Sequence, residues 1–430
     1  MSDDQIEVIA SKFIDVCDST TDPLELPHDI LGKVFESDLS GLKDTTRHNI
    51  IRCVSYYSLH PDLATREAVI EFFDRNSNDF DQLQDFLIQS LKPKLLRSNT
   101  DTNLRRGGSN GIGNLQRGLN PALGFSFEED KQISAWKKNG GIKNFSLFYL
   151  ILRTMRNKQV SLNLHWIIPG IMNMLDNTTD MKMIKMNGVL LLRTFLSYSF
   201  QNDIDSQSNN WISFQQTGIF EMVEPILLNL CYFLPPSYNE HESLDIHEQV
   251  YETLIVLYEQ SLEDAEMKRR IGRVLLSDII IRHTIPRIGI KYESLLEYQL
   301  TMIENITSIL KKSIIKYLQR ILFTFGKFII GDPFVTTTNK NIILHLVRIL
   351  NVLVNVCDAE RIQRHRYDFM LIICLIAEKY ESEGEMTDTL RHSLKEIFDN
   401  LETKGCNVIE ISRELKQKKG WLEAVLSNIG

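Results

Sequence analysis

The chain has 430 residues, of which 43% are hydrophobic and 24% are charged, and its formal net charge is −8. This composition is that of a folded, non-fibrous protein long enough for more than one ordinary domain. The negative charge argues against nucleic-acid binding, because neutralisation of phosphates by a basic face supplies most of the affinity in such complexes.

Apolar residues recur at helical spacing along most of the chain. Between 294 and 310, for example, Leu296, Leu300 and Ile303 follow one another at steps of four and three, with polar residues on the other face. Similar stripes lie at about 44–59, 64–74, 80–91, 143–155, 161–175, 181–199, 217–233, 244–261, 265–279, 313–330, 339–356, 361–380 and 387–402. Most prolines fall between stripes, where they end helices. Pro169 and Pro225 fall inside stripes, and there we expect a kink or a helix that begins at the proline.

Many helices of this length with short connections predict an all-α fold, an α-solenoid of degenerate HEAT-like helix pairs. We expect more than half of the chain to be helical, with antiparallel pairs forming an elongated, curved rod. One segment resembles a HEAT turn: Asp180 closes the turn, Ile184 packs inward, Lys185 follows, and the small Gly188 lets the next helix approach.

The predicted helices fall into three regions. Residues 1–92 form an acidic helical region, since residues 1–90 hold 18 acidic and 7 basic side chains. Residues 93–126 form a basic linker rich in glycine and asparagine, and 97–117 should be mobile because they offer no apolar stripe to bury. Residues 127–430 form the solenoid.

The sequence offers no set of residues with the spacing of a catalytic or metal site. The six cysteines form no C-x-x-C pair, so we expect reduced, buried thiols, and no zinc site. GGSNGIGN at 107–114 lacks the flanking strand and helix of a phosphate-binding loop. No stretch of about 18 apolar residues is present to span a membrane, and the acidic N-terminus is unlike a secretory signal. We therefore expect no enzyme activity, no cofactor, no metal, and a cytoplasmic and nuclear location.

The remaining candidates are surface features. Trp136, Trp166 and Trp421 lie at the edges of stripes, where aromatic side chains serve either as core residues or as interface anchors. The basic clusters 268–270 and 416–419 read as solvated helix ends, with phosphate contact or a nuclear signal as the alternatives.

Four segments together resemble one family. They are GLNPALGF at 118–125 with AWKKNGG at 135–141, the stretch 164–192, the stretch 217–236, and the stretch from 287 to 333. The second carries Trp166, Pro169, Asp176, Lys185 and Gly188 in the family's most recognisable block. The chain resembles the Tti-two family (Tel-two-interacting protein two), which supplies a subunit of the Triple-T (TTT) complex.

This resemblance implies a non-catalytic scaffold or adaptor that binds two larger helical-repeat subunits, Tel-two-interacting protein one and Tel-two. It further implies action as a co-chaperone with heat shock protein 90 in the maturation and stability of phosphatidylinositol-3-kinase-related kinases. Those kinases act in TOR signalling, the DNA damage response and telomere maintenance, and in fungi the trimer is counted in the ASTRA complex. No direct contact with nucleic acid or membrane is implied.

The resemblance marks Trp136, Trp166, Pro169, Asp176, Lys185 and Gly188 as partner-binding or family-motif residues. Two other classes stay open. One is another helical-repeat scaffold, such as a transport adaptor or a kinase regulatory subunit, which its cellular partners would reveal. The other is an all-helical enzyme, which a pocket with converging acid–base or metal-binding groups would reveal.

Overall fold

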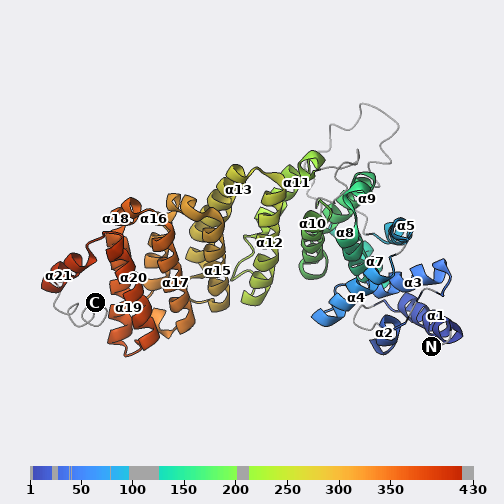
Figure 1. The fold of residues 1–430 in the computed structure, drawn as a ribbon, viewed down its shortest axis with the longest axis horizontal. Coiled ribbons are helices and arrows are strands. Elements are labelled where there is room, and N and C mark those ends of the chain that lie inside the picture. The colour runs from blue at the N-terminus through green and yellow to red at the C-terminus, as the bar shows by residue number, and fades with distance from the viewer. Residues whose placement is uncertain are drawn as a thin grey trace. The chain divides into compact units, whose positions relative to one another are not determined.

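The computed structural model describes residues 3–21, 28–37, 39, 41–77, 79–95, 125–200 and 213–418. Within these ranges the chain is all-α: more than half of all residues lie in helices, and the described part contains no strand (Figure 1). The predicted fold class is confirmed. The chain divides into two compact units, 1–221 and 222–430. No helix in the described part is long and apolar enough to cross a bilayer.

Unit 1 is built from short and medium helices. Their bounds are α1 (Asp3–Ser19), α2 (His28–Phe35), α3 (Asp44–Ser55), α4 (Leu63–Arg75), α5 (Phe80–Leu91), η2 (Lys92–Lys94), α7 (Phe125–Lys138), α8 (Lys143–Thr154), α9 (Asn157–Leu175), η3 (Met181–Lys185), α10 (Met186–Tyr198) and η4 (Phe214–Thr217). Helix α1 packs on α3, α3 on α5, α5 on α8, and α8 on α10. The apolar stripes thus bury one another in a row of neighbouring helices.

An ion pair between the buried Arg52 and the partly exposed Asp18 joins α1 to α3 in unit 1. The guanidinium of Arg52, which is only 6% exposed, donates to both carboxylate oxygens of Asp18 at 2.7 and 2.8 Å. It also donates to the hydroxyl of Tyr56 at 2.9 Å. These hydrogen bonds from Arg52 hold the pKa of Asp18 below its usual value. Bidentate pairs of this kind fix orientation as well as adding energy.

The C-terminal end of α1 is capped from far along the chain. The ammonium group of Lys143, at the start of α8, donates to the carbonyl oxygens of Cys17 and Thr20, both at 2.7 Å. The last carbonyls of a helix have no partner within it, and a cation there also matches the negative end of the helix dipole. Burial lowers the pKa of Lys143. This contact therefore fixes α1 against α8.

Unit 2 consists of longer helices in a regular stack. Their bounds are α11 (Phe220–Leu230), α12 (Glu240–Ser261), α13 (Asp264–Arg270), η5 (Ile271–Thr284), α14 (Ile285–Ile288), α15 (Glu293–Leu310), η6 (Lys311–Lys316), α16 (Leu318–Thr324), η7 (Phe325–Ile330), η8 (Val335–Thr337), α17 (Lys340–Val356), α18 (Ala359–Arg364), α19 (Arg366–Ser382), α20 (Asp388–Thr403) and α21 (Val408–Lys418).

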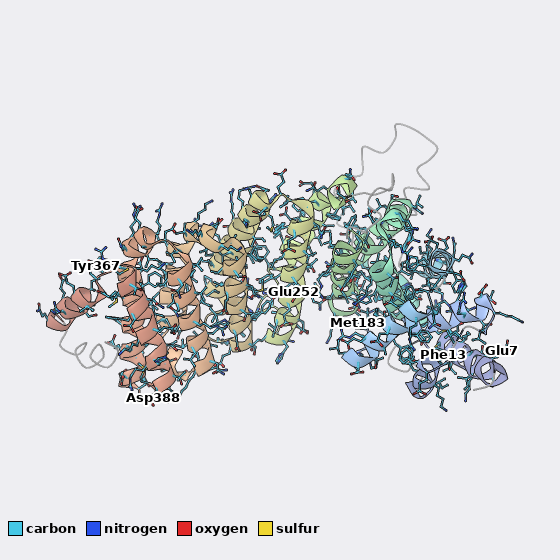
Figure 2. The ribbon with its side chains drawn as sticks, viewed as in Figure 1. Glu7, Phe13, Met183, Glu252, Tyr367 and Asp388 are labelled. Atoms are coloured by element: carbon cyan, nitrogen blue, oxygen red, sulfur yellow. The ribbon has the colours of Figure 1, made fainter. Side chains whose placement is uncertain are left out.

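Two layers of helices form unit 2. In one layer α12 packs on α15, α15 on α17, and α17 on α20 (Figure 1). In the other, η5 packs on α16, and α16 and η7 pack on α19. Tyr367 begins α19 and Asp388 begins α20 at opposite ends of this helix pair, as antiparallel neighbours require (Figure 2). Contacts of each pair with the next are the arrangement of an α-solenoid.

Local sequence signals explain where several of these helices begin. The carboxylate of Asp62 accepts from the backbone N–H of Thr65 at 2.9 Å and caps α4. Asn239 and Glu242 form a reciprocal capping box at the start of α12. The hydroxyl of Thr387 accepts from the backbone of α20. Such caps satisfy the free N–H groups of the first turn.

Three segments adopt wider, π-helical turns: η3, η5 and η7. In η5, Gly272 lies against the phenol ring of Tyr317, and a Cβ at this position would come within 2.5 Å of a ring atom. The absence of a side chain at Gly272 therefore sets the distance between η5 and the segment before α16.

Several predictions about individual segments can now be compared with the structure. Pro169 and Pro225 both lie inside single continuous helices, α9 and α11, so the expectation of a helix beginning at either proline is wrong. The segment 97–117, which we predict to be mobile, the sequence GGSNGIGN at 107–114 and Trp421 lie outside the described residues. The regions 1–92, 93–126 and 127–430 and the curved rod stay predictions.

Candidate functional site

Three family-motif residues of the second segment, Asp176, Lys185 and Gly188, lie where α9 is followed by η3 and α10. Gly188 of α10 is buried against the end of α9, and a Cβ there would lie 2.9 Å from the Cβ of Met174 and 3.1 Å from the backbone nitrogen of Leu175. The predicted close approach at Gly188 is confirmed. Only glycine fits this crossing without moving backbone.

The charged motif residues flank this crossing. Asp176 is exposed at the C-terminal end of α9, and Lys185 is half-buried at the end of η3. Burial lowers the pKa of Lys185, and the charge of Asp176 acts in the opposite direction. The structure therefore brings Asp176, Lys185 and Gly188 together around one inter-helix turn.

Asp180 organises the turn and ties it to α7. Its Oδ1 accepts from the backbone N–H of Met183 at 2.8 Å, which caps η3. Its Oδ2 forms an ion pair with the ammonium group of Lys137. The acidic residue closes the turn as the sequence predicted, and the contact with Lys137 is an addition that only the fold supplies.

The two motif tryptophans pack on the same helix, α8. The indole of Trp136 lies 5.3 Å from the ring of Phe145, and that of Trp166 lies 5.4 Å from Phe148. Trp136 also donates its indole N–H to the carbonyl oxygen of Lys94 at 2.9 Å. Trp136 is half-buried and Trp166 is 7% exposed. Both rings therefore contribute to packing within unit 1.

The remaining motif residue, Pro169, is exposed on α9. Its neighbour Gly170 faces the core, close to the ring of Phe148. The structure places Pro169 on the opposite side from the buried stripe and apart from the cluster around Gly188.

A cavity of about 580 Å³ opens in unit 1 beside this motif. Its lining comes from five places in the chain: the end of α1, the segment after α3, the end of α7, the start of α8 and the η3–α10 segment. The lining residues are Thr21, Tyr56, Tyr57, Leu59, His60, Pro61, Lys137, Lys138, Ile142, Phe145, Ser146, Met183 and Asn187. Met183, labelled in Figure 2, is 40% exposed.

The chemistry of this cavity favours binding over reaction. Tyr56, Phe145 and Ile142 supply an apolar surface, and Lys137 and Lys138 add positive charge. Burial raises the pKa of Tyr56 to about 12, so its hydroxyl stays protonated at neutral pH. Across the described residues no group of three or more His, Cys, Asp or Glu side chains is placed to hold a metal ion. A cavity with this lining is suited to binding an apolar side chain or an apolar part of a ligand.

Sequence reasoning missed the cavity residues Tyr56, Met183 and Asn187. Met183 and Asn187 are four residues apart on η3 and α10, on a different face from Ile184 and Gly188, which are buried. No unusual pattern in the local sequence marks Met183 or Asn187 as cavity residues. The other walls come from distant segments and leave no local pattern.

These features define the class of the chain: an all-helical repeat protein with packed motif residues and an apolar cavity. The model of the Tti2 family matches residues 50–337. The chain is also 36% identical over 367 residues to TEL2-interacting protein 2 of Saccharomyces cerevisiae strain ATCC 204508 / S288c. This alignment covers 83% of this chain and 84% of the relative. The chain therefore belongs to the Tti2 family, as its motifs predicted.

Proposed function

We propose that this chain is a non-catalytic scaffold subunit of the TTT complex and binds Tel-two and Tel-two-interacting protein one. The observation that carries the proposal is membership of the Tti2 family, with a relative whose name states an interaction with TEL2. The shared sequence covers 83% of this chain and 84% of the relative, which supports a shared role.

The fold is suited to this function. Helices stacked in layers expose long, continuous faces, and solenoids use such faces to hold other large proteins. The motif residues Gly188 and Trp166 fix how neighbouring helices pack, and so hold the shape of the surface. The cavity beside Met183 supplies apolar contact area in place of reacting groups.

The finer part of the proposal concerns what the assembly does. Acting with heat shock protein 90, the complex would help newly made phosphatidylinositol-3-kinase-related kinases to mature and remain stable. It would do so in the cytoplasm and the nucleus, and in fungi as part of the ASTRA complex. A chain that recognises partially folded clients through a trimer needs binding surfaces and no active site of its own.

Affinity purification of the chain, tagged at its own locus, tests the composition of the assembly. We expect two large helical-repeat proteins at equal molar amounts, with the chaperone and the kinases in smaller amounts. Untagged cells supply the background control. Recovery of a transport adaptor or an isolated kinase as the stoichiometric partner, without the two helical-repeat proteins, would replace this proposal with the generic scaffold.

A further inference from the structure

Helix α16 and its flanking turns expose a regular stripe of side chains on unit 2. Lys316, Arg320, Phe323 and Lys327 follow at steps of four, three and four, and all four are exposed. This spacing places them on one face of a helical segment. A stripe of three cations interrupted by a phenylalanine is unlike the mixed charges of an ordinary solvated face.

Neighbouring helices extend the stripe on both sides. On the η5 side, Arg320 donates to the hydroxyl of Ser277. Burial raises the pKa of Tyr317, while the charges of Arg269, Arg273 and Arg320 oppose that rise and the carboxylate of Asp278 adds to it. Arg273 is exposed and lies four residues before Ser277 in η5. The positive surface therefore continues from α16 onto η5.

On the α19 side the stripe meets an aliphatic side chain. A Cβ at Gly326 would lie 3.7 Å from the side chain of Ile372, so α19 passes close to η7 at this point. Leu371, the residue before Ile372, is 57% exposed. We call the surface made by Arg273, Lys316, Arg320, Phe323 and Lys327 the α16 face, and Leu371 lies on the neighbouring helix α19.

The α16 face exposes large apolar groups to solvent. Phe323 is 60% exposed, and the ammonium group of Lys327 lies 5.4 Å from the centre of its ring and 5.2 Å from that of Phe328. An exposed aromatic ring beside a cation is typical of an interface anchor. Removing such an exposed ring from water in a complex contributes favourable free energy to binding.

The cations of the α16 face also differ from nearby cations in ion pairing. Within the described part of the chain, Arg273, Lys316, Arg320 and Lys327 form no ion pair. Nearby cations are paired: Arg269 contacts Glu266, for example. Among the described residues these four cations are thus left without an ion-pair partner, on a chain whose net charge is −8.

We propose that the α16 face docks an acidic, amphipathic segment of a partner protein. Carboxylates of the segment would pair with the four cations, and an apolar side chain would pack on Phe323. The inference deepens the proposed scaffold function and rests on it for the partner's being a protein. The negative net charge of the chain also favours a protein over nucleic acid.

Photo-crosslinking in living cells tests what occupies the face. The full-length chain carrying Phe323→p-benzoylphenylalanine is irradiated, and the joined segment is sequenced by mass spectrometry. We expect one protein segment with several Asp or Glu residues and at least one apolar anchor. A nucleic-acid adduct, a basic or uncharged segment, or no adduct beyond that of the same substitution at the exposed Ile409 would overturn the proposal.

Binding measurements on matched variants test the chemistry. The captured segment is made as a labelled peptide, and its Kd for the full-length chain is measured by fluorescence anisotropy. Arg320→Glu combined with Lys327→Glu should weaken binding at least about tenfold, and Phe323→Ala by about tenfold. Lys395→Glu on α20, an exposed cation of the other layer, should change Kd less than about twofold. Circular dichroism confirms that each variant is folded.

The two proposals fail in different ways. If the charge-reversal variant binds the peptide as tightly as the unchanged chain, the α16 face is not the docking site, even where the two large TTT subunits are still recovered. If those subunits are not recovered but the acidic segment of another protein is captured at position 323, the docking chemistry holds and the assignment to the TTT complex fails.

Discussion

Gly188 gives the sharpest test of how the motif shapes unit 1. A side chain at this position must enter the crossing of α10 with the end of α9, where a Cβ would lie 2.9 Å from the Cβ of Met174 and 3.1 Å from the backbone nitrogen of Leu175. Neither atom is the end of a flexible side chain. A Gly188→Leu variant must therefore push the two helices apart.

The size of the effect follows from two opposing contributions. Replacing a helical glycine gains up to about 1 kcal/mol of helix propensity. Overpacking a tight core crossing typically costs about 1–3 kcal/mol, with larger side chains at the upper end. For Gly188→Ala the two nearly cancel or leave a small loss. For Gly188→Leu we expect a net destabilisation of about 1–3 kcal/mol.

The assay is thermal unfolding of the full-length chain followed by circular dichroism. In a unit of this size each kcal/mol lowers the melting temperature by about 2–4 °C. Gly32 in α2 is the matched control, because a Cβ there meets nothing within 4 Å and Gly32→Ala should be neutral or stabilising. An unchanged melting temperature for Gly188→Leu would refute the close approach of the helices at this crossing.

Three further predictions concern single side chains. Arg52 lowers the pKa of Asp18, so their ion pair stabilises unit 1 at pH values above the ordinary aspartate pKa of about 3.9, and this stabilisation is lost as the pH falls through the lowered pKa. In the Asp18→Asn variant, the free energy of unfolding should therefore depend less on pH in this acid range. The same pH dependence in the variant and the unchanged chain would contradict this. Burial lowers the pKa of His247 to about 4. The free energy of unfolding should therefore fall as the pH drops from about 6.5 towards that value. NMR should show that the imidazole ring of His247 is neutral at about pH 5.5. Trp136→Phe removes the indole N–H that donates to the carbonyl oxygen of Lys94, and it should lower the free energy of unfolding in denaturant by about 0.5–1.5 kcal/mol. An unchanged free energy of unfolding would show that this hydrogen bond does not stabilise the fold.

The helical stripes in the sequence predicted most of the fold because each helix buries an apolar face. The stripe at 80–91 coincides with α5, and that at 339–356 is α17 with one residue added. The predicted stripes do not include α1, although its buried face carries Phe13 together with the smaller residues Ala10 and Cys17. They also do not include α7, whose sequence FSFEEDKQISAWKK is largely polar.

The candidate site was only partly predictable. Asp180 and Gly188 act within one turn and the next helix, so their spacing in sequence carried their roles. Lys143 gave no such signal, because its partners Cys17 and Thr20 are more than 120 residues away. Lysines are mostly exposed, so sequence alone favours a surface position for Lys143.

The cavity and the α16 face could not be predicted from the sequence, for the same reason. The cavity walls come from five separate places in the chain, and no one of them has an unusual local pattern. On the α16 face, the stripe from Lys316 to Lys327 is regular, but its meaning depends on Arg273 in the neighbouring segment η5 and on whether nearby carboxylates pair with its cations. Long-range packing decides both features.

The central claim is that this chain serves the maturation of related kinases through the TTT complex. The most direct measurement is a pulse–chase of phosphatidylinositol-3-kinase-related kinases after rapid depletion of the chain, with their messenger RNAs measured in parallel. The account predicts that newly made kinase is lost, that kinase made before depletion persists at first, and that the messenger RNAs stay constant. Normal abundance and activity of newly made kinases over several cell divisions would contradict it.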